Sequence, residues 1–264
     1  MQFSESLLIL ASKLNYQDMH YDLVKNILFL DLETASQQQH FEELNERFSE
    51  LWKKKSAFLR KDSPPGEVYP EKAAIYAEFG KIICIGLGFF AQEEGELVFK
   101  TRVLKQANEE EILREFASLL GKLGPKNWRL CAHNGKEFDF PYLCRRMLIN
   151  RIPLPGLLQL MGRRPWEISH LLDTMEMWKF GDYKAFTSLD LMAACLEVPG
   201  SKDDINGSQV GQVYHQDKDL ERIARYCQKD VATMAMVFMR LSGLEILPEA
   251  RIRHEDSSPD EGDH

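Results

Sequence analysis

Four apolar segments along the chain have the length and composition of buried β-strands. The first, residues 26–32 (NILFLDL), is hydrophobic at most positions, and so is the second, residues 81–90 (KIICIGLGFF). Short runs of this kind, bounded by polar residues, are typical of strands that are covered on both faces. The same pattern predicts two further strands, at residues 96–103 and 128–133 (WRLCAH).

Helical periodicity follows the third and the fourth of these segments. Asn108 can cap a helix that runs to about residue 124, because Asn accepts a hydrogen bond from the first turn and apolar residues then recur on one face. A second helix is predicted at residues 138–151, with Pro141 near its first turn, where proline is tolerated. Later helices are predicted at residues 188–197 and 218–241.

The order of these elements predicts an α/β fold, in which a β-sheet has helices against both faces. We expect an N-terminal extension at residues 1–25 and one folded domain at residues 26–247. Between the first two strands, a long charged segment predicts a helical insertion at about residues 37–78. Residues 248–264 are acidic and poor in apolar side chains, which predicts a disordered tail.

Charge and composition restrict the classes of function. The formal charge of −8 argues against a protein whose whole surface wraps nucleic acid, but it leaves room for a local basic groove. Basic pairs such as Arg145 and Arg146 could contact phosphates or lie on a solvated face. The first residues lack the features of a signal peptide, and no apolar run is long enough to span a bilayer. We therefore expect a cytoplasmic protein that does not contact a membrane.

Two carboxylates lie at the end of the first predicted strand. Side chains alternate along a strand, so Asp31 and Glu33 point the same way as Ile27 and Phe29. Two like charges side by side on a hydrophobic strand are unfavourable unless a cation compensates them. An isolated D-x-E, however, more often marks a strand end that reaches solvent.

Two further motifs follow in the order that a shared site would need. In CAHNGKEFDFPYL, Asp139 comes after the fourth strand, where it could also simply cap the next helix. In RYCQKDVATM, Tyr226 and Asp230 are one helical turn apart and share one face of the last helix. Each motif alone is weak evidence for a shared site, whereas the three motifs in this order are specific evidence for one.

With these motifs the chain resembles the DEDD exonuclease superfamily, tyrosine subgroup, and in particular a stand-alone form of the proofreading exonuclease domain of family B DNA polymerases. The resemblance runs from about Asn26 to Leu241 and is carried by FLDLET, HNGKEFDFPYL and YCQKD. The sister subgroup has a histidine in place of the tyrosine, where this chain has Arg225. The resemblance implies an RNase H-like mixed β-sheet and 3′-to-5′ hydrolysis of nucleic acid, most simply of single-stranded DNA.

The resemblance also implies the composition of the site. Two Mg²⁺ or Mn²⁺ ions would be held by Asp31, Glu33, Asp139 and Asp230, while Tyr226 would orient the attacking water. Hard divalent cations prefer oxygen ligands, which agrees with four carboxylates and no adjacent Cys or His cluster. Asp173 is a spare acid that we interpret as structural. Residues expected to contact the substrate are Thr34, Asn134, Phe138 and Phe140.

Three other functions remain possible at this point. An exoribonuclease would use the same metal chemistry, because a contact to the 2′-hydroxyl decides between RNA and DNA and the sequence does not reveal one. An inactive nucleic-acid-binding module is disfavoured by the intact acidic set. An endonuclease of the ribonuclease H type is disfavoured by the second and third motifs.

Overall fold

The computed structural model describes residues 21–59, 62–123, 127–182, 184, 186–200 and 204–255. Most of the predicted N-terminal extension therefore lies outside the described residues. None of the helices among the described residues combines the length and the hydrophobicity that a membrane span requires.

A six-stranded mixed sheet forms the centre of the molecule, with the strand order β5-β4-β1-β2-β3-β6. β1 is antiparallel to β2 and parallel to β4, so the chain enters the middle of the sheet first. β3 is antiparallel to β2, and the two edge strands β5 and β6 are parallel to their neighbours. The strands are β1 (Ile27–Ser36), β2 (Gly80–Glu93), β3 (Glu96–Leu104), β4 (Arg129–Ala132), β5 (Leu171–Asp173) and β6 (Ile252–His254).

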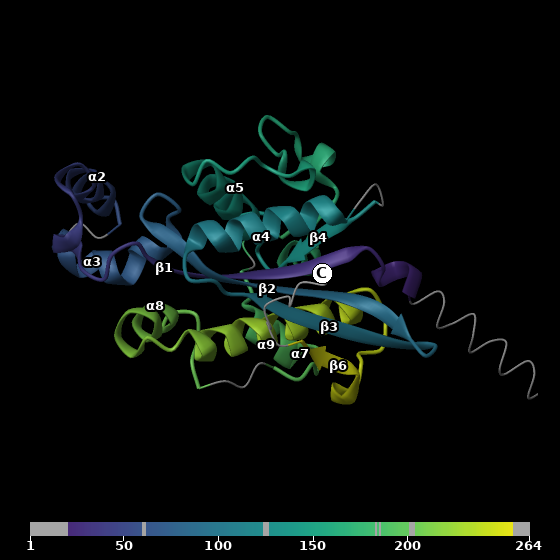
Figure 1. The fold of residues 1–264 in the computed structure, drawn as a ribbon. Coiled ribbons are helices and arrows are strands. Elements are labelled where there is room, and N and C mark those ends of the chain that lie inside the picture. The colour runs from purple at the N-terminus through teal and green to yellow at the C-terminus, as the bar shows by residue number, and fades with distance from the viewer. Residues whose placement is uncertain are drawn as a thin grey trace, which may run out of the picture.

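Helices cover both faces of this sheet (Figure 1). On one face lie α4 (Glu109–Lys122) and α5 (Asp139–Ile149), and on the other lies the long α9 (Leu220–Leu241) with α7 (Leu189–Cys195) and α8 (Val210–Gln212). Phe29 of β1 joins the sheet to α9, because its ring packs edge-on against Phe238 at a centroid distance of 5.4 Å. The predicted α/β arrangement is thus confirmed.

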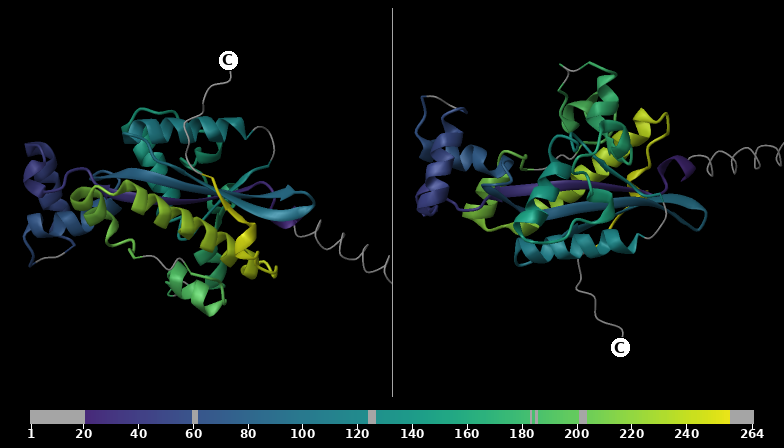
Figure 2. Two further views of the ribbon diagram at one scale, coloured as in Figure 1. Left: turned by 60° about the horizontal axis from the view of Figure 1, so that its bottom comes forward. Right: turned by 90° about the horizontal axis from the view of Figure 1, so that it is seen from above.

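The segment between β1 and β2 is helical and lies beyond one end of the sheet (Figure 2). It has a small aromatic core of its own, in which Trp52 is fully buried and packs against Tyr69 and Phe79 at centroid distances of 5.2 and 4.9 Å. The Trp52 indole N–H donates to the carbonyl of Pro65 at 2.9 Å. This hydrogen bond links the helix that contains Trp52 to the helix that begins at Pro65. The elements are η1 (Phe41–Glu43), α2 (Glu46–Ser56), α3 (Pro65–Lys72) and η2 (Ala73–Ile75).

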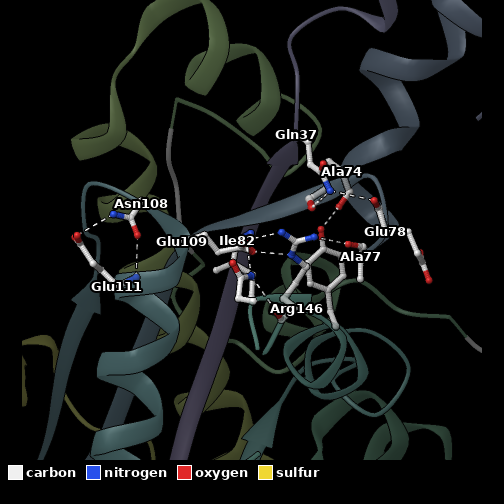
Figure 3. Close-up of polar contacts among 12 residues, drawn as sticks. Gln37, Ala74, Ala77, Glu78, Ile82, Asn108, Glu109, Glu111 and Arg146 are labelled. Atoms are coloured by element: carbon white, nitrogen blue, oxygen red, sulfur yellow. Dashed lines mark hydrogen bonds and ion pairs between the residues drawn. The ribbon is translucent and has the colours of Figure 1, made fainter. Parts of the chain in front are cut away.

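A buried ion pair fixes the end of this insertion to the main domain (Figure 3). Arg146 of α5 pairs with Glu109 at the start of α4, and its Nη1 donates to the carbonyl of Ala77 at 2.7 Å. Glu109 also accepts from the backbone N–H of Ile82 at 2.7 Å. Arg146 is only 5% exposed, so it has a structural role and does not contact phosphates.

Several short elements are not expected from the sequence, and one corrects a domain boundary. Residues 249–254, which fall in the predicted disordered tail, form η6 (Glu249–Arg251) and β6, and Ile252 pairs with Phe99 of β3. β6 is too short and too polar for periodicity to reveal it, because its stability depends on the sheet edge that it joins. The other unexpected elements are β5, α6 (Thr174–Lys179), η3 (Gly156–Leu158), η4 (Pro165–Ile168) and the π-helix η5 (Val213–Asp217).

Candidate active site

A cavity of about 640 Å³ opens where β1, α5, α9 and the helical insertion meet. Its wall includes all four carboxylates of the three sequence motifs together with Tyr226. Residues that are more than 190 positions apart in the sequence are therefore neighbours in space, since Cys227 of α9 lies within 3.5 Å of Asp31. The lining also includes Thr34, His133, Asn134 and Phe138.

β1 supplies Asp31 and Glu33 from its middle, because the strand continues beyond the predicted end at residue 32 as far as Ser36. Their partners on β2 are Gly86 and Cys84, and the register shifts directly after Glu33. Gly86 allows α9 to approach the sheet closely, because a Cβ atom there would lie 2.8 Å from the sulfur of Cys227 and from Val231. This close approach brings the face of α9 that carries Asp230 to the middle of β1.

The loop after β4 and the start of α5 supply Asp139. The carboxylate of Asp173 holds this loop, since it accepts from the backbone N–H groups of Asn134 and Lys136, both at 3.0 Å. Asp173 also accepts from Met175 at 2.9 Å and so caps α6. These hydrogen bonds confirm that Asp173 is structural, and they set the place from which Asp139 reaches the cavity.

α9 supplies Tyr226 and Asp230, one turn apart on the face that lines the cavity. The hydroxyl of Tyr226 donates a hydrogen bond to the carboxylate of Asp230. Between them in sequence, Cys227 contacts Asp31, and its thiol is 3.5 Å from Oδ2. The last helix thus places a phenol, a thiol and a carboxylate beside Asp31 and Glu33 of β1.

Three of the four carboxyl groups of this site, those of Asp31, Glu33 and Asp139, have raised pKa values. Burial first, and the charge of Asp230 second, raise the pKa of Asp31 to about 7 from an ordinary value of 3.8. The pKa values of Glu33 and Asp139 are raised well above their usual range, again by burial first and by Asp31 second. Burial and the nearby carboxylates also raise the pKa of the Tyr226 hydroxyl.

The donor set suits a divalent cation. Within the described ranges, no lysine or arginine forms an ion pair with Asp31, Glu33 or Asp139. Ligand atoms of Asp31, Glu33 and Cys227 lie within 4.8 Å of one another. Buried carboxylates without a counter-charge are costly, and a hard cation with oxygen ligands removes that cost.

Of the four residues expected to contact substrate, Thr34, Asn134 and Phe138 line the cavity. The prediction for Phe140 is wrong, because its side chain is fully buried in the main core and lies close to Gly135. α5 begins at Asp139, and its first turn directs Phe140 inward. Asn134 has a positive φ of 60°, and its buried side-chain oxygen has no hydrogen-bond partner among the described residues.

Part of the cavity wall is not found by sequence reasoning. The insertion contributes Lys72 and Ile75, and the segment before α9 contributes Gly207 and Gly211. No local pattern marks Lys72 and Ile75, because they belong to the site only through the packing of the insertion against the sheet, and none marks the two glycines as lining residues. Cys227, one of five scattered cysteines, has the pattern of an ordinary structural thiol, although its position next to Tyr226 is a signal that it lies near the site.

Residues 75–251 match the model of a family described as a predicted 3′-5′ exonuclease related to the exonuclease domain of PolB. Among solved structures, the chain is similar to the family B DNA polymerase from the hyperthermophilic archaeon Pyrobaculum calidifontis, with a TM-score of 0.50 and 15% sequence identity. That match covers 81% of this chain and 24% of the polymerase chain, so this chain spans about a quarter of the relative's length. No curated protein matches the sequence. The structural likeness concerns the fold alone, and it confirms the predicted RNase H-like fold class.

Proposed function

We propose that this chain, which belongs to the family of predicted 3′-5′ exonucleases related to the exonuclease domain of PolB, removes nucleotides from the 3′ end of single-stranded DNA. It is an enzyme, and its substrate is a nucleic acid. The preference for DNA, the use of two Mg²⁺ or Mn²⁺ ions and membership of the tyrosine subgroup are parts of the proposal. A cytoplasmic location stays a prediction from the sequence.

One observation carries the proposal: carboxylates from β1, α5 and α9 line one cavity together with Tyr226, and Asp31, Glu33 and Asp139 have no cationic partner among the described residues. In this proposal Asp31, Glu33, Asp139 and Asp230 hold two divalent cations. When bound, such ions lower the pKa of a coordinated water and neutralise charge that develops on the phosphate and the leaving 3′ oxygen.

The residues of the chain then have separate tasks. The four carboxylates bind the ions, and Tyr226 orients the attacking water through its hydroxyl, which Asp230 already holds in a hydrogen bond. A neutral phenol suits this task, because burial and the surrounding carboxylates raise the pKa of Tyr226 and keep its proton in place. Thr34, Asn134 and Phe138 contact the terminal nucleotide, and the ring of Phe138 can stack on a base whatever its identity.

The test uses purified protein with 5′-labelled single-stranded DNA, recessed duplex DNA and RNA, each with Mn²⁺ or with EDTA. We expect a ladder shortened from the 3′ end of the single-stranded DNA, only with Mn²⁺, and none with the Asp230→Asn variant. Undiminished cleavage in EDTA, or release of 5′-terminal mononucleotides first, would contradict the proposal. Faster degradation of RNA than of DNA would replace DNA with RNA as the substrate.

A further inference from the structure

A second cavity, of about 360 Å³, lies beside the catalytic cavity, and its chemistry differs. It is lined by Gln37, Gln38 and Gln39 after the end of β1, and by Lys81, Tyr214 and Lys218. No acidic cluster is present there, because Glu43 is the one carboxylate among the described lining residues. The local charge is therefore opposite to that of the catalytic cavity, in a chain whose formal charge is −8.

Two segments of the chain each contribute lining residues to both cavities. Thr34 of β1 lines the catalytic cavity, and Gln37, the first residue after β1, lines the second one. Three residues of extended chain span about 10 Å, so the two are near neighbours. On the other side, Gly211 of α8 lines the catalytic cavity, and the π-helix η5 that follows places Tyr214 in the second. π-Helices occur often at functional sites.

One of the two lysines of the second cavity lies over an aromatic ring. The Nζ atom of Lys81 lies 4.8 Å from the centroid of the Tyr214 ring. Lys218 and His215 line the same cavity as Lys81, and the pKa of His215 is lowered, first by burial and then by the charges of the two lysines. His215 itself is held by Ser36, whose hydroxyl and carbonyl oxygens are 3.0 and 3.1 Å from its Nε2.

The lysines have no carboxylate partner in the described part of the chain, while the nearby acids are engaged elsewhere. Asp217 pairs with Arg222, and Asp219 caps α9 through the N–H of Arg222. Glu43 accepts from two backbone N–H groups at 3.0 and 3.2 Å. Lys81 and Lys218 thus remain available to an external anion, beside an aromatic ring that is partly exposed.

We infer that this second cavity binds the nucleic-acid strand on the 5′ side of the scissile bond, with Lys81 and Lys218 on backbone phosphates and Tyr214 against a base. Stacked bases and a positively charged groove are the general means by which proteins hold single strands without sequence preference. The inference rests on the proposed function, since the catalytic cavity must hold the 3′ end. A single nucleotide bound on its own would meet the same groups, and the experiment separates the two sources.

The experiment measures kcat/KM for the first cleavage of a thymidine dinucleotide and a thymidine 12-mer, for the wild type and for Lys81→Gln, Lys218→Gln and the double variant. Lys122→Gln is the matched control, because Lys122 is an exposed lysine at the end of α4 and lines neither cavity. Each phosphate contact to a single strand gives a slope of about −0.7 in the plot of log affinity against log salt. Between the 1 M reference and 0.1 M salt this slope corresponds to a factor of about five. Loss of one contact therefore lowers the affinity about fivefold at 0.1 M salt.

We expect each lysine variant to lower kcat/KM for the 12-mer about fivefold and to make its salt dependence shallower by about 0.7. The dinucleotide should be cleaved as by the wild type, because its only phosphodiester occupies the catalytic cavity. Equal losses for both substrates, or no loss for the 12-mer, would overturn the inference. Inhibition by free thymidine monophosphate that depends on the two lysines while the 12-mer is unaffected would instead assign the cavity to a free nucleotide, and would also overturn it.

Fluorescence anisotropy with the labelled 12-mer separates this inference from the proposed function. If the wild type cleaves no substrate, the proposed function fails, and loss of 12-mer binding in the double variant still supports the second cavity as a strand site. If the wild type cleaves both substrates and the double variant binds the 12-mer as tightly as the wild type does, the strand site is wrong and the function stands.

Discussion

Replacing Asp31 with asparagine should make the metal-free protein more stable while it abolishes activity. In the wild type the Asp31 carboxylate lines one cavity with Glu33, Asp139 and Asp230. Burial first, and the charge of Asp230 second, raise its pKa to about 7. At pH 8 the group is ionised and repelled by its neighbours. The Asp31→Asn substitution keeps the size and polarity of the side chain and removes the charge, so the repulsion is relieved.

The magnitude follows from the pKa. A tenfold change in proton affinity is worth about 1.4 kcal/mol, so a rise from 3.8 to about 7 corresponds to on the order of 4 kcal/mol. The carboxyl group is enclosed by protein, but part of the residue is exposed. Water in the open cavity screens the charge, so we expect a gain of about 1–3 kcal/mol at pH 8.

The sign of the pH dependence is fixed by linkage. Because the folded protein binds the Asp31 proton more tightly than the unfolded chain does, the free energy of unfolding of the metal-free wild type falls as the pH rises from about 4 to about 7. Asp31→Asn lacks the part of this fall that Asp31 contributes, while Glu33 and Asp139, whose pKa values are also raised, still contribute theirs. Below about pH 4 the carboxyl group is protonated in both states, so the gain from the variant disappears.

Urea unfolding in EDTA at several pH values between 4 and 8 measures this effect, with Glu245→Gln as the control because Glu245 is exposed and lies outside the site. Adding Mn²⁺ at pH 8 should raise the stability of the wild type and leave Asp31→Asn unchanged, since only the protein that binds the ion gains stability from it. A variant less stable than the wild type in EDTA at pH 8, or a gain of the same size at pH 4, would refute the reasoning.

Three further predictions concern other parts of the structure. Tyr226→Phe should lower the rate of 3′ cleavage by about 10²- to 10⁴-fold and leave Mn²⁺ binding, followed by calorimetry, nearly unchanged; loss of binding as complete as in Asp230→Asn would make Tyr226 part of the ion site. Glu109→Gln should lower the free energy of unfolding by about 3–5 kcal/mol in urea titrations, because it leaves the buried Arg146 guanidinium without its counter-charge; a loss below about 1 kcal/mol would indicate that water reaches the arginine. Truncation after Leu247 should destabilise the protein by removing β6 and should increase hydrogen exchange in β3; unchanged exchange there would mean that β6 adds nothing to the sheet.

The sequence alone determined the strands β1 to β4 and the long helices, because these depend on local pattern, and its ordered motifs singled out four carboxylates. β1, β2 and β3 carry dense apolar runs, and α4 and α9 carry helical periodicity, so their positions follow from the alternation of apolar and polar residues. The ordered set of motifs brought Asp31, Glu33, Asp139 and Asp230 together before any contact was known, and the structure places all four on one cavity.

Only the tertiary structure decided which side chains of these elements face the cavity and what completes its wall. Phe138 and Phe140 are both aromatic and nearly adjacent, yet the start of α5 between them turns one toward the cavity and the other into the core. The sequence shows that Arg146 is basic but does not show whether its partner is a phosphate or Glu109, and the structure shows that it is Glu109. The insertion, β6 and the second cavity acquire their surroundings from residues far away in the sequence, and because no local pattern encodes those long-range contacts, packing alone determines them.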